Sequence, residues 1–368
     1  MARRDLLIVG GGIIGCAAAA FAAERGASVL LLEREAIGAG ASGRNSGAVQ
    51  HPFDPVLAEL HRTTRRIYDE LSAADRAAFD FPSSPAGLLL LTDDLPAAHA
   101  RIDELRAQDP ALAPELMDEP ALRSLEPMLA GGLSAIRLET GFPIPPEAAT
   151  EAFATRARRA GVEIRLGDSV EAVLDGPGVR LADGTTIAAQ AVLVAAGPWV
   201  PSLLLQGGAA TIRPTYGVTL QVSLAEAPRS VLEEGAVHTV NRPLAEAADA
   251  GVVTFSMVTV GGTSTVGSTF LSAMPDPAEM APRLLDNGAR FVPALRGSRI
   301  VQQRVCLRPQ SPDGRPFLGP VPGSPGVFVA AGHGPWGMST GPASATLVVD
   351  AILEGAAVPA ELAADRHL

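Results

Sequence analysis

A glycine-rich turn near the N-terminus has residue types and a spacing that suit phosphate binding. A hydrophobic run leads into Gly10-Gly11-Gly12-Ile13-Ile14-Gly15, which has the G-x-G-x-x-G spacing, and an alanine-rich segment follows. Gly10 permits a sharp turn after a strand, Gly12 lets a pyrophosphate approach the backbone, and Gly15 lets a helix pack closely on the sheet. The N-terminus of that helix would offer free N–H groups and a partial positive charge to the phosphates.

An acidic residue follows this turn at a distance suited to ribose recognition. The hydrophobic run 29–32 ends at Glu33, where a carboxylate can accept hydrogen bonds from both ribose hydroxyls. Strand, turn, helix, strand and acid occur in order, so the segment predicts a dinucleotide-binding unit. The alternative is a glycine-rich turn in an ordinary α/β unit.

A second glycine-rich segment lies just after Glu33. Residues 38–47 include four glycines and several small polar side chains. Such a loop exposes its backbone and suits a second close approach of the ligand. The alternative is a flexible surface loop.

The composition limits the class of protein. With 368 residues, 47% of them hydrophobic, the chain has enough length for about two to three globular domains. Its net charge is −11 and no run of basic residues exceeds two, which argues against nucleic-acid binding. All 29 basic residues are arginine, and the only cysteines are Cys16 and Cys306. One cysteine pair is no disulfide framework, so a reducing cytoplasmic location is expected.

No segment of the sequence is expected to cross a membrane. Arg3 and Arg4 precede an apolar run and so imitate a signal peptide, but Asp5 and the glycine triplet argue against one. No other uncharged apolar stretch reaches the length that a transmembrane helix needs.

Hydrophobic periodicity predicts helices and strands in an α/β arrangement. The first helix should end before a C-terminal cap at Gly26, and the last should begin at a cap on Ser339 or Thr340. Residues 110–146 look irregular. Helices are expected over 13–25, 54–81, 95–107, 146–160, 277–288 and from about 339 to Gly355. Strands are expected over 86–91, 162–166, 169–174, 178–181, 186–187, 191–196, 215–222, 251–260, 263–270 and 326–331.

Four segments together resemble one enzyme family. They are the Gly10–Gly15 turn with Glu33-Arg34, the loop 41–47, the turn 195–199, and the pair formed by 307–316 with 332–337. In order and spacing the chain resembles the D-amino-acid oxidase superfamily of FAD enzymes. Within it, the chain is similar to glycine oxidase, sarcosine oxidase and the FAD subunits of hydroxyproline and opine dehydrogenases.

The resemblance implies an α/β fold with a discontinuous, Rossmann-like FAD-binding domain and an inserted, β-rich α+β substrate domain. The FAD-binding domain would comprise 1–50, 146–208 and 304–368, and the substrate domain 51–145 and 209–303. The resemblance also implies oxidation of a carboxylate-bearing amine or amino acid, N-substituted or cyclic substrates included. A hydride would pass to flavin N5 and leave an imine that hydrolyses. The alternative is an FAD-dependent 2-hydroxy-acid dehydrogenase.

Three residues are candidates for the substrate site. Arg308 would hold a substrate carboxylate through two parallel hydrogen bonds, or else form a structural ion pair. Tyr216 would cover the pocket or donate to the substrate, or else pack in the core. His51 follows the second glycine-rich loop and would lie beside the flavin, or else serve a structural role.

The resemblance also implies a set of contacts to FAD. The turn before the last helix would place backbone N–H groups near the N1–C2=O edge of the flavin, with Trp336 as a contact or a packing aromatic. Cys306 stands where sarcosine oxidase-type enzymes attach FAD covalently, or else packs as a buried thiol. Cys16 is expected to pack in the core. The expected contacts are Gly10, Gly12, Ile13, Ile14, Gly15, Glu33, Arg34, Ser42, Arg44, Asn45, Ser46, Gly47, Val170, Ala196, Gly197, Trp199, Cys306, Gly334, Pro335, Trp336, Gly337 and Met338.

The absence of lysine bears on the electron acceptor. Sarcosine oxidase-type enzymes use a lysine that faces the flavin to promote the reaction with oxygen, and Thr265 stands at the matching position. Oxygen, a quinone and a partner subunit are all candidate acceptors. The missing lysine favours a dehydrogenase.

Overall fold

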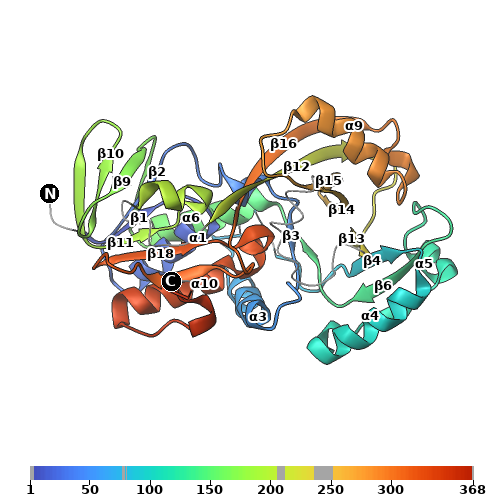
Figure 1. Ribbon diagram of the computed structural model, residues 1–368, viewed down its shortest axis with the longest axis horizontal. Helices are drawn as coiled ribbons and strands as arrows, with labels where there is room; N and C mark the ends of the chain where they lie inside the picture. Colours follow the sequence, from blue (N-terminus) through green and yellow to red (C-terminus); the bar gives the residue numbers. More distant parts are fainter. Residues whose placement is uncertain (1–3, 77–78, 80, 205–211, 236–251, 367–368) are drawn as a thin grey trace.

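A computed structural model describes residues 4–76, 79, 81–204, 212–235 and 252–366. Figure 1 shows two parts, each built on a sheet, with β16 and β12 extending from the second sheet toward the first. The expected α/β fold is confirmed. No helix in the described ranges is long and apolar enough to span a membrane.

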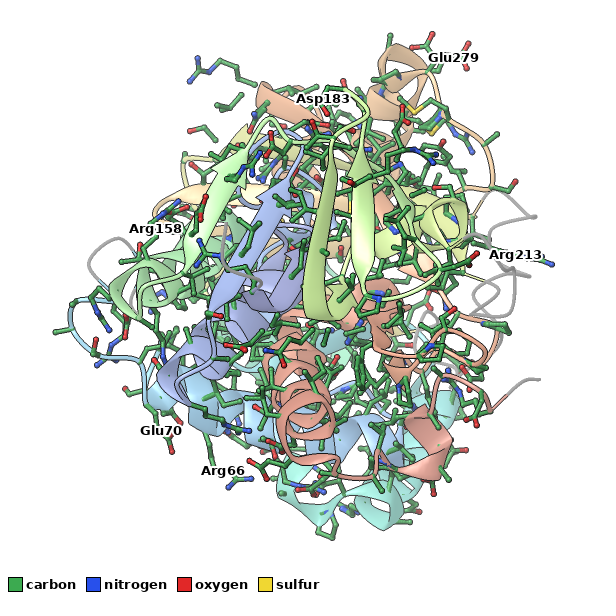
Figure 2. All side chains as sticks on the ribbon, turned by 90° about the vertical axis from the view of Figure 1, so that its left-hand side faces the viewer. Arg66, Glu70, Arg158, Asp183, Arg213 and Glu279 are labelled. Carbon is green, nitrogen blue, oxygen red and sulfur yellow. The ribbon has the colours of Figure 1, made fainter. Side chains whose placement is uncertain are left out.

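The first sheet has a parallel centre. β1 pairs in parallel with β11 and β2, β2 with β8, and β11 with β18, whereas β17 is antiparallel to β18. A hairpin branches from β11, and Figure 2 shows Asp183 at its turn. In order, the strands are β17 (Phe317–Pro320), β18 (Val327–Ala331), β11 (Thr186–Val194), β1 (Arg4–Val9), β2 (Val29–Glu33) and β8 (Glu163–Leu166), with β10 (Gly178–Leu181) and β9 (Val170–Val173) in the branch.

Helices bury one face of this sheet. The alanine-rich α1 (Ile13–Glu24) contacts both α6 (Pro146–Arg159) and α10 (Gly337–Glu354), and α3 (Pro55–Asp69) packs against α10. Their apolar side chains share one core with those of β1 and β2. Because α1 presents mostly alanines, neighbouring helices approach it closely, and this fixes the turn at its N-terminus.

The second sheet joins segments from distant parts of the chain. Helix α9 (Pro277–Gly288) covers one face, and α4 (Leu95–Gln108) packs on part of the other. Further short elements are α2 (Ala41–Arg44), α5 (Glu119–Leu125), α7 (Val200–Leu203) and the pair β3 (Ala48–Val49) with β7 (Phe142–Pro143). In order, its strands are β16 (Arg299–Gln310), β12 (Arg213–Ser223), β15 (Thr263–Phe270), β14 (Val252–Val260), β13 (Val231–Glu234), β4 (Leu88–Thr92), β6 (Ser134–Leu138) and β5 (Glu115–Met117).

Four expectations about local structure are wrong. The helix expected over 54–81 ends at Asp69, and residues 110–146 contain β5, α5 and β6 rather than irregular chain. Two expected strands, 186–187 and 191–196, form the single strand β11. Helix α10 begins at Gly337, directly after a 3-10 turn, so Ser339 and Thr340 lie inside it. Residues 77, 78 and 80 of the expected helix and residue 251 of an expected strand lie outside the described residues.

The division into a cofactor domain and a substrate domain stays a prediction, and two elements cross its boundaries. Residues 304–310 were placed in the cofactor domain, yet they belong to β16 of the second sheet. Helix α3 was placed in the substrate domain, yet it packs in the core of the first sheet. The two parts are therefore joined through shared elements.

Candidate active site

A cavity of about 740 Å³ opens at the carboxyl ends of the central parallel strands. Its lining comes from the segments that follow β1, β2 and β11, and from β16 and the start of α10. Ligands of open α/β sheets bind at this edge. The cavity extends from the first sheet to the second, where Tyr216 and Arg308 line it.

The turn after β1 accepts only glycine at two positions. Gly10 has a φ of 111°, and a Cβ there would lie 2.6 Å from the carbonyl oxygen of Ala195. A Cβ on Gly15 would lie 2.0 Å from the carbonyl oxygen of Gly10. The turn is therefore compact, and the start of α1 lies against the cavity as phosphate binding requires.

Glu33 is fixed at the end of β2. One carboxylate oxygen accepts from the Gly11 N–H at 2.7 Å, and the other accepts from the Glu35 N–H at 2.9 Å. Each carboxylate oxygen has a further lone pair, so both can still accept hydroxyl protons from a ribose. The donor and acceptor pattern therefore fits the adenosine half of a dinucleotide.

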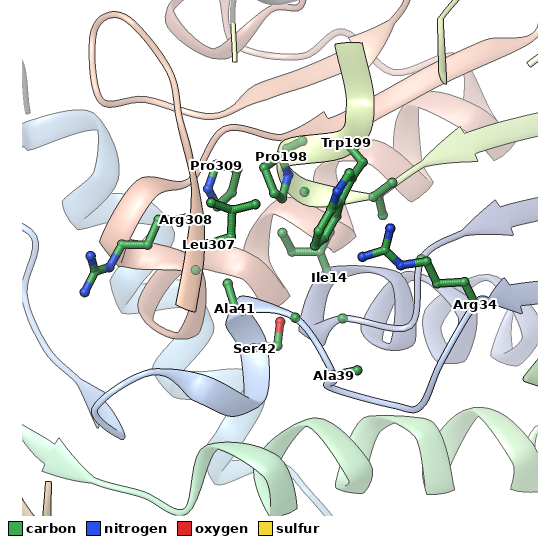
Figure 3. Close-up of a pocket in the computed structure, with 18 of the residues that line it drawn as sticks. Ile14, Arg34, Ala39, Ala41, Ser42, Pro198, Trp199, Leu307, Arg308 and Pro309 are labelled. Carbon is green, nitrogen blue, oxygen red and sulfur yellow. The ribbon is translucent and has the colours of Figure 1, made fainter. Parts of the chain in front are cut away.

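One end of the cavity has an aromatic and cationic lining. The Arg34 guanidinium lies 3.9 Å from the centroid of a Trp199 ring. Figure 3 shows these two side chains together on one side of the cavity, with Arg308 extending from β16 on the other. A planar guanidinium and an indole suit contact with an adenine ring.

The second glycine-rich loop is held by its own hydrogen bonds. The Asn45 side chain donates to the carbonyl oxygens of Ala41 and Ser42 at 3.0 and 2.9 Å, and its oxygen accepts from the Gly47 N–H. The Ser42 hydroxyl accepts from the Ile13 N–H at 3.0 Å and so joins the loop to the start of α1. Residues 41–44 of the segment form the short helix α2.

The start of α10 lies at the second-sheet end of the cavity. Gly334, Gly337 and Met338 line it, and no side chain caps the helix N-terminus. Burial lowers the pKa of His333 to about 3, so this neighbour is neutral and adds no charge. The positive charge at this point therefore comes from the backbone N–H groups at the start of α10. A partial positive charge there suits an anionic flavin edge. Trp336 is outside the lining and packs against two hydrophobic clusters. This position fits the alternative in which Trp336 is a packing aromatic.

Arg308 is a buried cation with no acidic partner among the described residues. Its guanidinium donates to the Thr269 carbonyl oxygen at 2.8 Å and to the Ser268 hydroxyl at 2.7 Å. Burial lowers the pKa of Arg308, but arginine stays charged at any working pH. Three of its five N–H groups are left for a ligand, which fits a substrate carboxylate.

The other two candidates for the substrate site differ in position. Tyr216 lines the cavity, and its backbone pairs with Leu307 of β16. His51 is outside the lining and has structural contacts: its Nδ1 accepts from the Phe53 N–H, and its Nε2 lies 3.3 Å from the Asp109 carboxylate. Burial lowers the pKa of His51.

The two cysteines are free and buried. Cys16 packs in the helical core, and burial raises the pKa of its thiol. Cys306 lines the cavity at 1% exposure, and burial raises the pKa of its thiol against the lowering by Arg308, Arg44 and Arg304. Packing of Cys306 and its covalent attachment to FAD both stay predictions. The mass of the denatured protein distinguishes the two.

The cavity brings together most of the expected cofactor contacts. Outside its lining are Gly15, Ser46, Gly47 and Trp336. Within it are Gly10, Gly12, Ile13, Ile14, Glu33, Arg34, Ser42, Arg44, Asn45, Val170, Ala196, Gly197, Trp199, Cys306, Gly334, Pro335, Gly337 and Met338. The sequence analysis missed other lining residues, including Arg180, Met274, Leu307 and Pro309. Leu307 and Pro309 are the sequence neighbours of Arg308. A strand predicted through Arg308 would therefore have indicated both as lining residues.

Comparisons with known proteins show the family of the chain. A family model described as "FAD dependent oxidoreductase" matches residues 5–351. The chain belongs to this family. The expected superfamily is confirmed, and the chain is an FAD-dependent oxidoreductase whose cofactor is FAD.

Three relatives span most of the chain. Hydrogen cyanide synthase subunit HcnC of Pseudomonas aeruginosa is 26% identical over 98% of this chain and 94% of its own length. Glycine oxidase of Geobacillus kaustophilus is 27% identical over 95% of this chain and 93% of its own length. D-amino acid dehydrogenase of Cereibacter sphaeroides is 29% identical over 80% of this chain and 67% of its own length.

Solved structures share the fold of this FAD-dependent oxidoreductase. The crystal structure of glycine oxidase from Geobacillus kaustophilus superimposes with a TM-score of 0.85 at 24% identity, and each chain is covered in full. L-proline dehydrogenase from P. horikoshii gives a TM-score of 0.83 at 19% identity, with 99% of this chain and 97% of its own covered.

Proposed function

We propose that this protein oxidises an amine or amino acid that carries a carboxylate. The hydride would pass from the substrate carbon to N5 of FAD, and the resulting imine would hydrolyse. The observation that carries the proposal is Arg308, a buried cation beside the cofactor cavity without an acidic partner in the described part of the chain.

The described residues have distinct tasks in this proposal. Arg308 binds the carboxylate and so holds the reacting carbon against the cavity. The N-terminus of α10 stabilises negative charge through backbone N–H groups that are already oriented. FAD, when bound, supplies the hydride acceptor.

The names of the relatives support amine chemistry. Glycine oxidase and D-amino acid dehydrogenase are both among them. The second candidate is oxidation of a 2-hydroxy acid, which Arg308 would bind equally well through its carboxylate. For location we propose the cytoplasm, because Cys16 and Cys306 are both free thiols.

An anaerobic screen tests the proposal. The holoenzyme is mixed with amino acids, N-methyl amino acids and 2-hydroxy acids, and flavin bleaching is followed near 450 nm. Bleaching by an amino acid or amine, with formation of the keto acid or aldehyde, is the expected result. Bleaching by 2-hydroxy acids alone would establish the second candidate in its place.

A further inference from the structure

The arginines that line the cavity differ in whether an acid balances their charge. Within the described part of the chain they are Arg34, Arg44, Arg180 and Arg308. Arg34 lies 3.4 Å from the Glu35 carboxylate, and Arg180 lies 3.9 Å from the Glu171 carboxylate. Arg44 and Arg308 have no acidic partner among the described residues. The cavity therefore contains two cations whose charge the described residues do not balance.

The acids of the described lining are all at the end that fits the adenosine half of FAD. They come from the end of β2 and from the chain at the start of β9, namely Glu33, Glu35, Asp168 and Glu171. The lining segments from α2, β16 and α10 contribute no acidic residue. The end of the cavity formed by these three elements is therefore positively charged and suits an anionic ligand.

Helix α2 places Arg44 beside β16. The helix ends at Arg44 and packs on β16, where the Arg304 guanidinium donates to the Gly43 carbonyl oxygen at 3.0 Å. Arg304, Cys306 and Arg308 share one face of β16 because they are two residues apart. Arg304 is outside the lining, and the charge of Glu147 acts to raise its pKa. Arg44 thus directly follows a residue that is bonded to the face that carries Arg308.

Cys306 lies within the influence of both unbalanced cations. It lines the cavity, and the charges of Arg308 and Arg44 both lower the pKa of its thiol, although burial raises that pKa more. The Arg44 side chain is exposed, so a ligand in the cavity can reach it. A ligand with one carboxylate balances one of the two cations and leaves the other without a partner.

The pyrophosphate of FAD is the other anion that the cavity has to hold. The Gly10–Gly15 turn and the start of α1 offer backbone N–H groups to it. Contact of Arg44 with FAD, which the family resemblance implies, is therefore the competing assignment for this side chain. The two assignments differ in what the loss of Arg44 does to FAD content.

We propose that Arg308 and Arg44 bind the two carboxylates of one substrate, so that the substrate is an amino acid or amine with two carboxylates. Arg308 holds the carboxylate next to the reacting carbon, and Arg44 binds the second one. This inference rests on the proposed function and narrows its substrate class.

Ligand binding to the oxidised holoenzyme tests the inference without turnover. Flavin difference spectra are titrated with two pairs of acids that differ by one carboxylate, propionate with succinate and butyrate with glutarate. In Arg44→Gln, affinity for the two diacids should fall about tenfold, the lower end for a hydrogen bond to a charged group, because Arg44 is exposed. Affinity for the two monoacids should not change. Arg44→Lys keeps the charge and should retain part of the preference for diacids.

The matched control is Arg299→Gln, at an exposed position of β16 outside the cavity lining. It should leave both members of each pair unaffected. Equal affinity of the wild type for monoacids and diacids, or the same preference in Arg44→Gln as in the wild type, would overturn the role of Arg44. Loss of FAD from Arg44→Gln would assign Arg44 to the cofactor and would also overturn it.

Flavin bleaching separates this inference from the proposed function. Anaerobic bleaching by aspartate, glutamate or another amine with two carboxylates, in preference to alanine and glycine, is the expected result. Bleaching by monocarboxylic amino acids alone would leave the proposed function standing and refute the second carboxylate. If no amino acid or amine of either kind bleaches the flavin, the proposed function itself fails.

Discussion

Arg308 concentrates positive charge at one end of the cofactor cavity. Within the described residues it is held by a carbonyl and a hydroxyl, neither of which carries a charge. An arginine buried in this way is costly unless an anion completes the site, because two neutral acceptors and the Phe270 ring, 4.8 Å away, compensate the lost hydration of the charge only in part. In the proposed function, the substrate carboxylate is that anion.

Replacing Arg308 with alanine should weaken carboxylate binding and leave FAD in place. Loss of a hydrogen-bonded charge pair costs on the order of 1.5–3 kcal/mol, or about tenfold to a hundredfold in affinity. Titration of the holoenzyme with the substrate found in the screen gives the change. An unchanged affinity would mean that Arg308 is structural only.

Gly217→Ala should weaken carboxylate binding nearly as much as Arg308→Ala, although residue 217 need not touch the substrate. The added methyl group would lie 2.2–2.3 Å from three guanidinium atoms of Arg308, so that side chain must move. Carboxylate affinity should fall by about as much as in Arg308→Ala, on the order of tenfold. The test is a double-mutant cycle. Gly217→Ala should cost nothing further when residue 308 is already alanine, and an additive loss would contradict the steric explanation.

At the scale of elements, the first turn of α10 depends on a hydroxyl from α3. Pro342 has no N–H, so the Met338 carbonyl lacks its helical donor, and the Tyr68 hydroxyl donates to it at 3.2 Å. Tyr68 is fully buried and stacks on Phe81 with ring centroids 4.9 Å apart. A helix that faces the cavity is thereby fixed by an aromatic residue of its neighbour.

Tyr68→Phe should reduce the free energy of unfolding by about 1–3 kcal/mol, the cost of one buried acceptor without a donor. The ring contacts are retained, so the change isolates the hydroxyl. Urea unfolding of the holoenzyme measures the difference. An unfolding midpoint equal to that of the wild type would show that the Met338 carbonyl has another donor.

Sequence patterns predicted the elements whose geometry is local. The turn Gly10–Gly15, helix α1 and Glu33 at the end of β2 lie within one short segment, so their spacing in the sequence was sufficient to predict this strand, turn, helix and strand. The Gly43–Arg304 and Gly217–Arg308 contacts depend on how β16 meets distant segments, and no local pattern specifies those contacts. The short strand β5 and helix α5 were missed because brief elements between prolines show little periodicity.

At the scale of the whole molecule, buried histidines make stability depend on pH. Burial lowers the pKa of His61 and of His333 to about 3 in the folded protein, against about 6.5 in an unfolded chain. The unfolded state therefore binds more protons below pH 6.5, and stability must fall as pH falls. Urea unfolding at pH 7.5 and 5.0 should show this loss, and His61→Gln should reduce it. Equal stability at the two pH values would contradict the burial of both imidazoles as neutral groups.

The last prediction concerns the electron acceptor and rests on the charges around the whole cavity. With no lysine in the chain, oxygen can meet positive charge only from arginine, histidine or helix N-termini. Thr265, expected at the lysine position, is buried and outside the cavity lining. His333 is neutral at working pH because of its low pKa, and in the proposed function Arg308 binds the substrate carboxylate.

Reduced enzyme should therefore react slowly with air and faster with a quinone or an artificial dye. A lysine ammonium beside the flavin would stabilise the negative charge that oxygen acquires, and such help is strong in a site that excludes water. Its absence should therefore slow the reaction with oxygen most. Holoenzyme reduced by substrate is mixed in a stopped-flow instrument with oxygenated buffer or with quinone, and the return of flavin absorbance is followed. Reoxidation by oxygen at least as fast as by quinone, with stoichiometric hydrogen peroxide, would contradict the dehydrogenase assignment. Arg44, a cation in the cavity lining, would then be the first residue to replace in search of the group that activates oxygen.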